Sequence, residues 1–252
     1  AAFSPDGSQI ATAGADGRIL LWNPDEVQPV DIARRIDGEA DPPAPFVELL
    51  GHEKPVCTIA FSPDGSQLVS GGEDNVSRIW SVATGEQTLS LRGHTSYVRD
   101  CLFSPHGSRV LSASRDQQVK LWNPADYGEA LALGRNEGSQ HADAVLSARF
   151  SSDGSRIVTA SRDRTAQLWD TQSQTLVESF NEGHEFLASY AVFFSGGSKL
   201  ATSAGDGTTR IWNVASGTEI DSLQGTGRTA ALDVSADGRW LAAAGNENNV
   251  KV

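Results

Sequence analysis

Histidine, hydroxyl and aspartate side chains recur together along the chain, and these are the residue types of a hydrolytic triad. One such set is His52, Ser70 and Asp74. In a triad the imidazole removes the proton of the hydroxyl nucleophile, while the carboxylate orients the imidazole. Histidine and aspartate are also common ligands of metal ions. The residue types therefore allow hydrolysis, metal binding or a purely structural hydrogen-bond network.

Repetition argues against the two chemical interpretations. An enzyme needs one asymmetric pocket, and a metal site needs ligands that converge on one point. These residues instead recur at matching offsets, each time followed by tryptophan, and two of the complete sets have threonine in place of serine. We therefore expect a structural role, with no catalytic residue, no metal and no cofactor. The sets are His52, Ser70, Asp74 and Trp80; His94, Ser112, Asp116 and Trp122; His141, Thr159, Asp163 and Trp169; His184, Thr202, Asp206 and Trp212; and Thr12, Asp16 and Trp22 without a histidine.

The sets lie inside a longer repeat. The tryptophans at 80, 122, 169 and 212 are 42, 47 and 43 residues apart, which is the size of one supersecondary unit. The gap between Trp22 and Trp80 is longer and contains an insertion. The copies are FSPDGSQIATAGADGRILLWN (3–23), FSPDGSQLVSGGEDNVSRIWS (61–81), FSPHGSRVLSASRDQQVKLWN (103–123), FSSDGSRIVTASRDRTAQLWD (150–170), FFSGGSKLATSAGDGTTRIWN (193–213) and a worn sixth, VSADGRWLAAAGNENNVKV (234–252).

Each copy is expected to form four short strands, a to d. In the second copy these are VCTIAFS, SQLVSGG, VSRIWS and EQTLSLR, because each run is apolar or alternating and is bounded by turn residues. The a–b turn is SPDGS, in which Pro63 presets the first turn position and Gly65 can adopt a positive φ. A single four-stranded meander cannot bury both of its faces. Neighbouring units must therefore stack around an axis.

The repeat resembles the WD40 family of β-propellers over essentially the whole chain outside the insertion. The family's Gly-His pair stands at Gly51-His52, Gly93-His94 and Gly183-His184, with the variant Gln140-His141, and its Trp-Asp pair stands at Trp169-Asp170. The resemblance implies an all-β propeller of four-stranded antiparallel blades, in which each set forms a hydrogen-bonded tetrad. The recurring FSPDG sequence is similar to bacterial members of the family, some of which are fused to signalling enzymes.

One propeller domain is expected over residues 1–252. Its sixth unit lacks the tetrad, since Gly225-Thr226 replaces the Gly-His pair and Ala243 and Glu247 occupy the hydroxyl and aspartate positions. We expect the six copies to belong to a longer chain that forms a seven-bladed ring, with a six-bladed ring as the alternative. The blades are expected at 1–50 with an insertion at 24–48, and at 51–92, 93–139, 140–182, 183–224 and 225–252.

Composition limits the classes of partner. The net charge of −12 over 252 residues repels polyphosphate and anionic lipid, so we expect neither nucleic acid nor a membrane surface as a partner. No apolar run has the length of a membrane span. Cys57 and Cys101 lie in apolar runs, where a free buried thiol is the ordinary interpretation. These features favour the cytoplasm.

Partner contacts are expected where the blades differ, because the shared positions are committed to the fold. The resemblance implies that the d–a and b–c connections lie on one face, which docks partners. Arg115 and Arg162 precede the aspartate in two successive sets, and together they form a basic cluster able to bind carboxylate or phosphate groups. The expected partner-binding residues are Lys54, Glu73, Tyr97, Arg115, Arg135, Arg162, Arg164 and Phe186.

The expected function is a non-catalytic scaffold that binds a peptide or a protein domain, and an acidic or phosphorylated partner fits the basic cluster. Two alternatives remain. One is a propeller that binds a small ligand or a glycan, although Tyr97 and Phe186 are few aromatic residues for such a site. The other is a regulatory module fused to a signalling enzyme in a longer chain.

Overall fold

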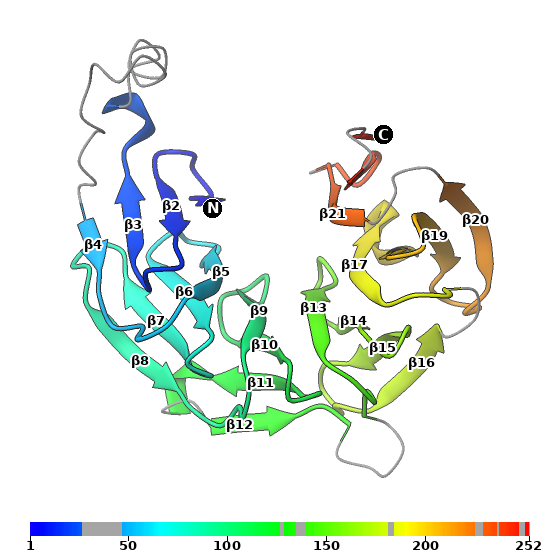
Figure 1. Ribbon diagram of the computed structural model, residues 1–252, viewed down its shortest axis with the longest axis horizontal. Helices are drawn as coiled ribbons and strands as arrows, with labels where there is room; N and C mark the ends of the chain where they lie inside the picture. The colour runs from blue at the N-terminus through cyan, green and yellow to red at the C-terminus, as the bar shows by residue number, and fades with distance from the viewer. Residues whose placement is uncertain are drawn as a thin grey trace.

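Antiparallel sheets follow one another along the chain and stand side by side in an open arc (Figure 1). The computed structural model describes residues 1–26, 47–126, 129–134, 140–180, 184–224, 229–235, 237–246 and 250–251. Within these ranges five sheets have four strands each and the last has three. The expected all-β fold of four-stranded blades is confirmed. Whether the full ring has six or seven blades stays a prediction.

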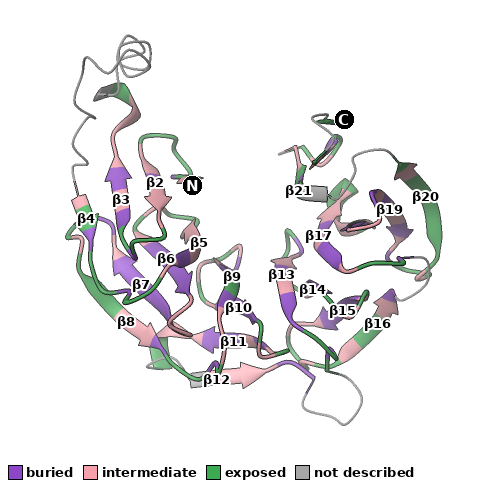
Figure 2. Cartoon of the chain, in the orientation of Figure 1, coloured by how far each residue is buried: buried purple, intermediate pink, exposed green. Residues whose placement is uncertain are grey.

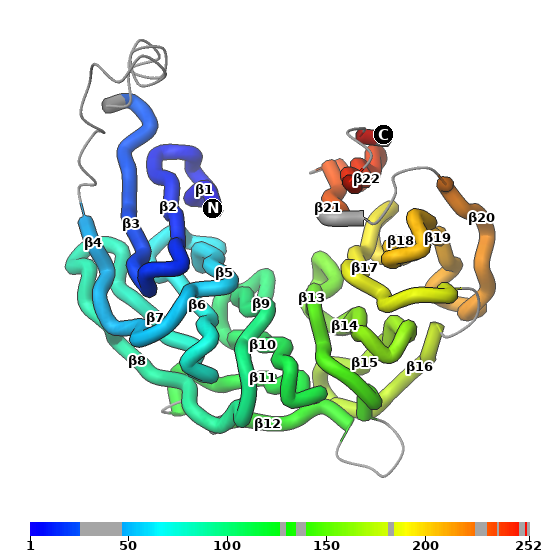
Figure 3. Tube along the Cα trace, in the orientation of Figure 1, coloured from blue at the N-terminus to red at the C-terminus, as the bar shows by residue number. Residues whose placement is uncertain are grey.

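In each sheet the first strand lies nearest the centre of the arc and the last lies toward the rim (Figure 3). The sheets are β1 (Ala2–Phe3), β2 (Ile10–Ala13), β3 (Ile19–Trp22) and β4 (Val47–Leu49); β5 (Val56–Phe61), β6 (Gln67–Gly72), β7 (Ser77–Ser81) and β8 (Gln87–Leu91); β9 (Val98–Phe103), β10 (Val110–Ser114), β11 (Val119–Asn123) and β12 (Glu129–Ala132); β13 (Val145–Phe150), β14 (Arg156–Ser161), β15 (Ala166–Asp170) and β16 (Leu176–Phe180); β17 (Ala188–Phe194), β18 (Lys199–Ala204), β19 (Thr208–Asn213) and β20 (Glu219–Gln224); and β21 (Thr229–Val234), β22 (Leu241–Gly245) and β23 (Val250–Lys251).

Short 3-10 turns follow three of the strands, at η1 (Pro24–Glu26), η2 (Pro124–Asp126) and η3 (Ser195–Gly197). The insertion expected at 24–48 is shorter than predicted, because β4 already begins at Val47 and pairs with β3. Residues 27–46 lie outside the described part of the chain, as does Glu247 of the sixth unit. None of the helices in the described ranges is long and apolar enough to cross a membrane.

The SPDGS turns fold by local hydrogen bonding. Ser62 Oγ donates to Asp64 Oδ1 at 2.6 Å, and the Ser66 amide donates to the same oxygen at 3.0 Å. The hydrogen bond from Ser62 is the largest of the interactions that lower the pKa of Asp64. Gly65 has φ of +72°, a conformation that costs other residues energy. The turn sequence therefore fixes the hairpin between β5 and β6 without help from distant residues.

Hydrophobic clusters lie between neighbouring sheets, so each blade buries its faces against the next one. A phenylalanine at the end of the innermost strand packs on the preceding sheet, and this position is Phe61, Phe103, Phe150 and Phe193 in the second to fifth sheets. Figure 2 shows that the two middle strands of a sheet are mostly buried, whereas rim strands such as β16 and β20 are largely exposed. Full burial of a residue such as Leu168 contributes roughly 1.5 to 3 kcal/mol.

A partly buried ion pair and a flanking hydrogen bond link three consecutive innermost strands. The Asp100 carboxylate on β9 accepts hydrogen bonds from the guanidinium of Arg149 and from the Ala148 amide, both on β13. On its other side Thr58 Oγ1 of β5 lies 3.4 Å from Asp100. Asp100 is the largest influence raising the pKa of Arg149, which keeps this guanidinium charged. The sequence analysis missed this pair, although a charged residue inside the apolar run VRDCLF was a usable signal.

Buried tetrads and a candidate interaction face

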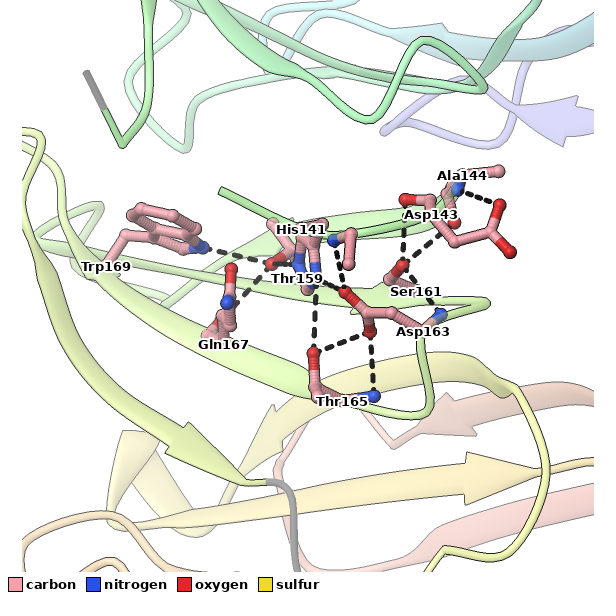
Figure 4. A network of polar contacts seen from close by, with 10 residues as sticks. His141, Asp143, Ala144, Thr159, Ser161, Asp163, Thr165, Gln167 and Trp169 are labelled. Atoms are coloured by element: carbon pink, nitrogen blue, oxygen red, sulfur yellow. Dashed lines mark hydrogen bonds and ion pairs between the residues drawn. The ribbon is translucent and has the colours of Figure 1, made fainter. Parts of the chain in front are cut away.

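The fourth sheet shows how the polar set is arranged (Figure 4). Trp169 Nε1 donates to Thr159 Oγ1 at 3.0 Å, and the same oxygen lies 2.7 Å from His141 Nε2. His141 Nδ1 lies 2.8 Å from the Asp163 carboxylate. Because an ionised carboxylate can only accept, Nδ1 carries the proton. A neutral imidazole then accepts the Thr159 O–H at Nε2, so every donor in the tetrad has an acceptor.

Three other sheets contain the same arrangement. The distance from His Nε2 to the hydroxyl oxygen is 2.8, 2.7 and 2.9 Å in the sets of His52, His94 and His184, and each tryptophan donates to that hydroxyl at 2.8 Å. The first sheet retains the hydrogen bond from Trp22 to Thr12 at 2.8 Å, while Asp16 there lies beside Arg18. The structure thus brings together all the residues of the four complete sets.

Supporting groups hold each tetrad aspartate ionised. Thr165 Oγ1 donates to Asp163 Oδ1 at 2.7 Å, and the Ala142 amide donates to Oδ2 at 2.9 Å. Burial acts to raise the pKa of Asp163, but the hydrogen bonds from His141 and Thr165 outweigh it, and the pKa lies well below the usual value. In the fifth sheet burial lowers the pKa of His184. A neutral imidazole beside a carboxylate is the resulting state.

The second sheet adds an arginine that the sequence analysis did not place in the tetrad. Arg78 Nη1 lies 2.6 Å from Asp74 and 2.7 Å from His52 Nδ1, and the residue is buried. Burial is the largest cause that lowers the pKa of His52, and the charge of Arg78 adds to it. Gly72 makes room for this arrangement, because a Cβ there would lie 2.8 Å from His52 Nδ1. An arginine inside the buried strand VSRIWS was the available signal.

The tetrad hydroxyls are out of reach of any substrate. Ser70, Ser112, Thr159 and Thr202 are each 0% exposed, and each oxygen already accepts a tryptophan N–H. A nucleophile must approach within bonding distance of a substrate atom, which these positions do not permit. Within the described ranges no group of three or more His, Cys, Asp or Glu residues has the geometry of a metal site. The tetrads therefore act in packing and in hydrogen bonding.

The b–c turns and the d–a connections lie on one face, which we call the interaction face. In the third sheet the Arg115 amide donates to the Tyr97 carbonyl at 2.9 Å, which ties the turn after β10 to the loop before β9. Equivalent hydrogen bonds join Glu73 to Pro55, Arg162 to Ala144 and Gly205 to Leu187. The turns that carry the variable residues are thus fixed directly above the tetrads.

The third and fourth sheets present cationic side chains on the interaction face. The Arg115 guanidinium lies over the Tyr97 ring, 5.5 Å from its centroid, in a cation–π contact. Arg162 and Arg164 are exposed on the next b–c turn. In the part of the chain that the structure describes, none of these three arginines has a carboxylate oxygen within 4.0 Å. Among the described residues they therefore form a cationic sector that no carboxylate neutralises, in a protein whose net charge is −12.

The remaining predicted partner-binding residues are distributed over the neighbouring blades. Lys54 is exposed and Glu73 half-buried on the second blade, while Phe186 on the fifth is 58% exposed. Arg135 lies outside the described residues. The structure adds Arg99, an exposed residue of β9 whose Nη1 lies 3.9 Å from Cys57 Sγ. Cys57 is a free thiol, and burial raises its pKa by more than Arg99 lowers it.

Comparison with known families agrees with the repeat geometry. The family model described as "WD domain, G-beta repeat" matches residues 1–23, 44–81, 85–123, 135–170 and 174–213, more than half of the chain. The chain belongs to the WD40 repeat family. The expected WD40 resemblance is thereby confirmed, and the literal Trp-Asp pair at Trp169-Asp170 is one instance of a motif that the other blades vary.

Individual WD40 relatives share only part of their length with this chain. Protein HIR1 of Kluyveromyces lactis is 33% identical over 85 residues, which are 32% of this chain and 10% of the relative. The hir1 protein of Schizosaccharomyces pombe is 36% identical over 76 residues, which are 30% of this chain and 8% of the relative. WD repeat-containing protein 1 of Mus musculus is 33% identical over 81 residues, which are 32% of this chain and 11% of the relative. These relatives are eukaryotic, which corrects the expectation of a bacterial-type member.

Proposed function

We propose that this WD40 chain is a non-catalytic scaffold that docks an acidic or phosphorylated segment of a partner protein on its interaction face. The single observation that carries the proposal is the cationic sector of Arg115, Arg162 and Arg164. Guanidinium groups bind carboxylates and phosphates through paired hydrogen bonds, and they do so best when no internal carboxylate competes.

Two features support docking at this sector over the rest of the face. Tyr97 holds Arg115 in place by the cation–π contact, so less side-chain freedom is lost when a partner binds. The backbone hydrogen bonds between turns and loops keep the sector rigid. Aromatic and arginine side chains that are already ordered are typical of the residues that dominate interface energies.

A charge-reversal experiment tests the proposal. Fluorescein-labelled peptides of alternating glutamate and serine, with and without phosphoserine, are titrated with the wild-type chain and with an Arg115→Glu/Arg162→Glu variant. Loss of two charged hydrogen-bonding partners is expected to weaken binding by at least about tenfold. The matched control is Arg109→Glu/Arg239→Glu, which makes the same change of charge beside the a–b turns, away from the interaction face.

Equal weakening by the two double variants would mean that only net charge matters, and it would refute a docking site at this sector. Unchanged affinity in the Arg115→Glu/Arg162→Glu variant would refute it as well. Circular dichroism spectra and urea midpoints of both variants should match those of the wild type, because all four residues lie outside the tetrads and the hydrophobic clusters.

A further inference from the structure

The third blade places two arginines at neighbouring backbone positions of the interaction face. Arg99 is the extra residue of a β-bulge in β9, and Arg115 is the first residue of the b–c turn after β10. Val98 and Ser114 are paired across the two strands, and the two arginines are the residues that follow them. Bulges re-aim side chains and are common beside functional sites.

The two guanidinium groups are positioned by different contacts. The Arg115 guanidinium lies over the Tyr97 ring, 5.5 Å from its centroid, and the Arg115 amide donates to the Tyr97 carbonyl at 2.9 Å. Arg99 Nη1 extends toward the second blade and lies 3.9 Å from Cys57 Sγ. Since β9 is the innermost strand of its sheet, Arg99 lies near the centre of the arc (Figure 3).

Cys57 shows that the two cations converge. Burial is the largest influence on its thiol and raises the pKa, while the charges of Arg99 and Arg115 both lower it. Charges shift a pKa in this way only from nearby. The Glu73 carboxylate, on the b–c turn of the second blade, acts on the same thiol in the opposite sense. Both arginines therefore lie close to the junction of the second and third blades.

Among the second to fifth blades, only the third has a cation at both positions. The residues at the bulge and at the start of the turn are Cys57 and Glu73 in the second blade, Leu146 and Arg162 in the fourth, and Ser189 and Gly205 in the fifth. The fold therefore does not require the arginine pair. Both side chains are exposed, and in the described ranges neither has a carboxylate oxygen within 4.0 Å.

A pair of guanidinium groups suits a phosphomonoester better than a carboxylate. A carboxylate carries a single charge on its two oxygens, so one guanidinium can satisfy it through paired hydrogen bonds. A phosphomonoester has three acceptor oxygens and a charge of about −1.5 to −2 at pH 7. Oxygen atoms and charge therefore remain for a second guanidinium after the first has bound.

We propose that Arg99 and Arg115 form a phosphate seat, which receives a phosphoserine or phosphothreonine side chain of the partner segment. The proposal rests on the docking function proposed above and deepens it. Arg115 attracts any acidic segment, and Arg99 gives the preference for a phosphorylated one. Glu73 lies more than 4.0 Å from both guanidinium groups, so it leaves their hydrogen-bond donors available to the phosphate.

The test uses the whole chain and two peptides that differ at one position. Both are fluorescein-labelled and alternate glutamate with serine, and the central residue is phosphoserine in one and glutamate in the other. Arg99→Gln is expected to weaken binding of the phosphoserine peptide by about tenfold and of the glutamate peptide by about twofold or less. Arg99→Lys should recover only part of the difference, because lysine cannot donate paired hydrogen bonds.

Arg92→Gln is the matched control. It removes the same charge from an exposed residue that directly follows the rim strand β8. Its affinities for the two peptides should stay close to those of the wild type. Equal weakening by Arg92→Gln and Arg99→Gln would show attraction by net charge alone and would overturn the phosphate seat.

Cys57 provides a local readout, because it lies beside Arg99 whereas Cys101, the other cysteine, is buried. A phosphate in the seat should slow alkylation of Cys57 by iodoacetamide severalfold. Mass spectrometry measures the ratio of the rates with and without saturating phosphoserine peptide. The peptide should give little protection in Arg99→Gln. Absence of protection in the wild-type chain would overturn the phosphate seat.

Failure of the phosphate seat can be told apart from failure of the docking proposal. Equal weakening of the two peptides by Arg99→Gln, or unchanged affinity for the phosphoserine peptide, would overturn the seat alone. The docking proposal fails instead when the Arg115→Glu/Arg162→Glu variant binds the glutamate peptide as tightly as the wild type does.

Discussion

The indole nitrogen of Trp169 lies 3.0 Å from the hydroxyl oxygen of Thr159. The Thr159 hydroxyl donates to His141 Nε2, and His141 Nδ1 donates to the Asp163 carboxylate. A chain of hydrogen bonds therefore crosses the blade from its packed interior toward the interaction face. The same chain recurs in three other blades. The tetrads that the blades share stabilise the fold. The turn and loop residues that vary give each blade a different surface.

Trp169→Ala should be strongly destabilising. The substitution removes a fully buried ring and leaves the Thr159 oxygen without its donor, and such losses cost about 3 to 5 kcal/mol in the free energy of unfolding. Urea unfolding followed by far-ultraviolet circular dichroism measures the loss. Trp240→Ala is the control, because this side chain is 58% exposed and its removal should change stability little. Equal stability of the two variants would contradict a packing role for the tetrad.

Thr159→Val separates hydrogen bonding from volume. Valine has nearly the same shape but cannot accept from Trp169 or donate to His141, so two buried groups lose their partner. The expected cost is about 2 to 6 kcal/mol, from about 1 to 3 kcal/mol for each unsatisfied group. Thr159→Ser retains the hydroxyl and should retain most of the stability, as the serine-containing blades do. A valine variant as stable as the serine variant would show that the network contributes nothing.

The tetrads make stability depend on pH in two steps. Burial lowers the pKa of His52 and His184 below the ordinary 6.5. The unfolded chain therefore binds more protons than the folded chain just below pH 6.5. This contribution to stability is complete above pH 6.5 and is lost as the pH falls. The aspartates act at lower pH. The pKa of Asp163 is lower in the folded chain than the ordinary 3.8, so its carboxylate stabilises the fold above pH 3.8. This stabilisation is lost as the pH falls through the pKa of the folded state.

Urea midpoints measured from about pH 8 down to about pH 5 follow the histidine step. The midpoint should stay constant at the upper end and then decline. His184→Asn should be less stable throughout and should have a shallower decline, because one of the titrating groups is gone. A midpoint that rises on acidification would mean that the folded histidines bind protons more tightly than the unfolded ones, contrary to a neutral buried imidazole.

Arg149→Met tests the ion pair between innermost strands. The variant leaves the Asp100 carboxylate, whose side chain is 11% exposed, without its cation. Loss of one partner of a fully buried pair costs 3 to 5 kcal/mol, and about 2 to 3 kcal/mol is expected because Arg149 is partly exposed. The Asp100→Asn/Arg149→Met double variant should recover part of the loss. A double variant less stable than the single one would indicate that Asp100 stabilises through other contacts.

The sequence predicted the tetrads well because their members recur at fixed offsets within one repeat. Residues such as Asp74 and His52 could be paired by counting along the chain, and no long-range information was needed. Asp100 and Arg149 were missed because their contact joins two blades, and its geometry depends on how neighbouring sheets stack. Arg78 was missed for a related reason. Lys120 and Arg210 occupy the same position in two other blades, so the residue type alone did not predict that Arg78 contacts His52 and Asp74.

The surface residues show the same difference between what could and what could not be predicted from the sequence. Tyr97 and Arg115 follow from repeat positions, but their stacking required the turn and the loop to be placed together. The acids Glu178 and Asp221 could have been found by comparing strand d across the copies, where the first three blades have aliphatic residues. The surface groove that Glu178 and Glu219 line could not, because two sheets form it. What the sequence specifies locally was predictable, and what arises between blades was not.

The most direct test of the account is the protonation of the tetrad histidines, read from ¹⁵N chemical shifts and long-range ¹H–¹⁵N couplings near neutral pH. For His94, His141 and His184 the account predicts neutral rings with the proton on Nδ1, bonded to aspartate, and a bare Nε2 that accepts the serine or threonine hydroxyl. Charged rings, or rings protonated on Nε2 that exchange freely with water, would contradict it.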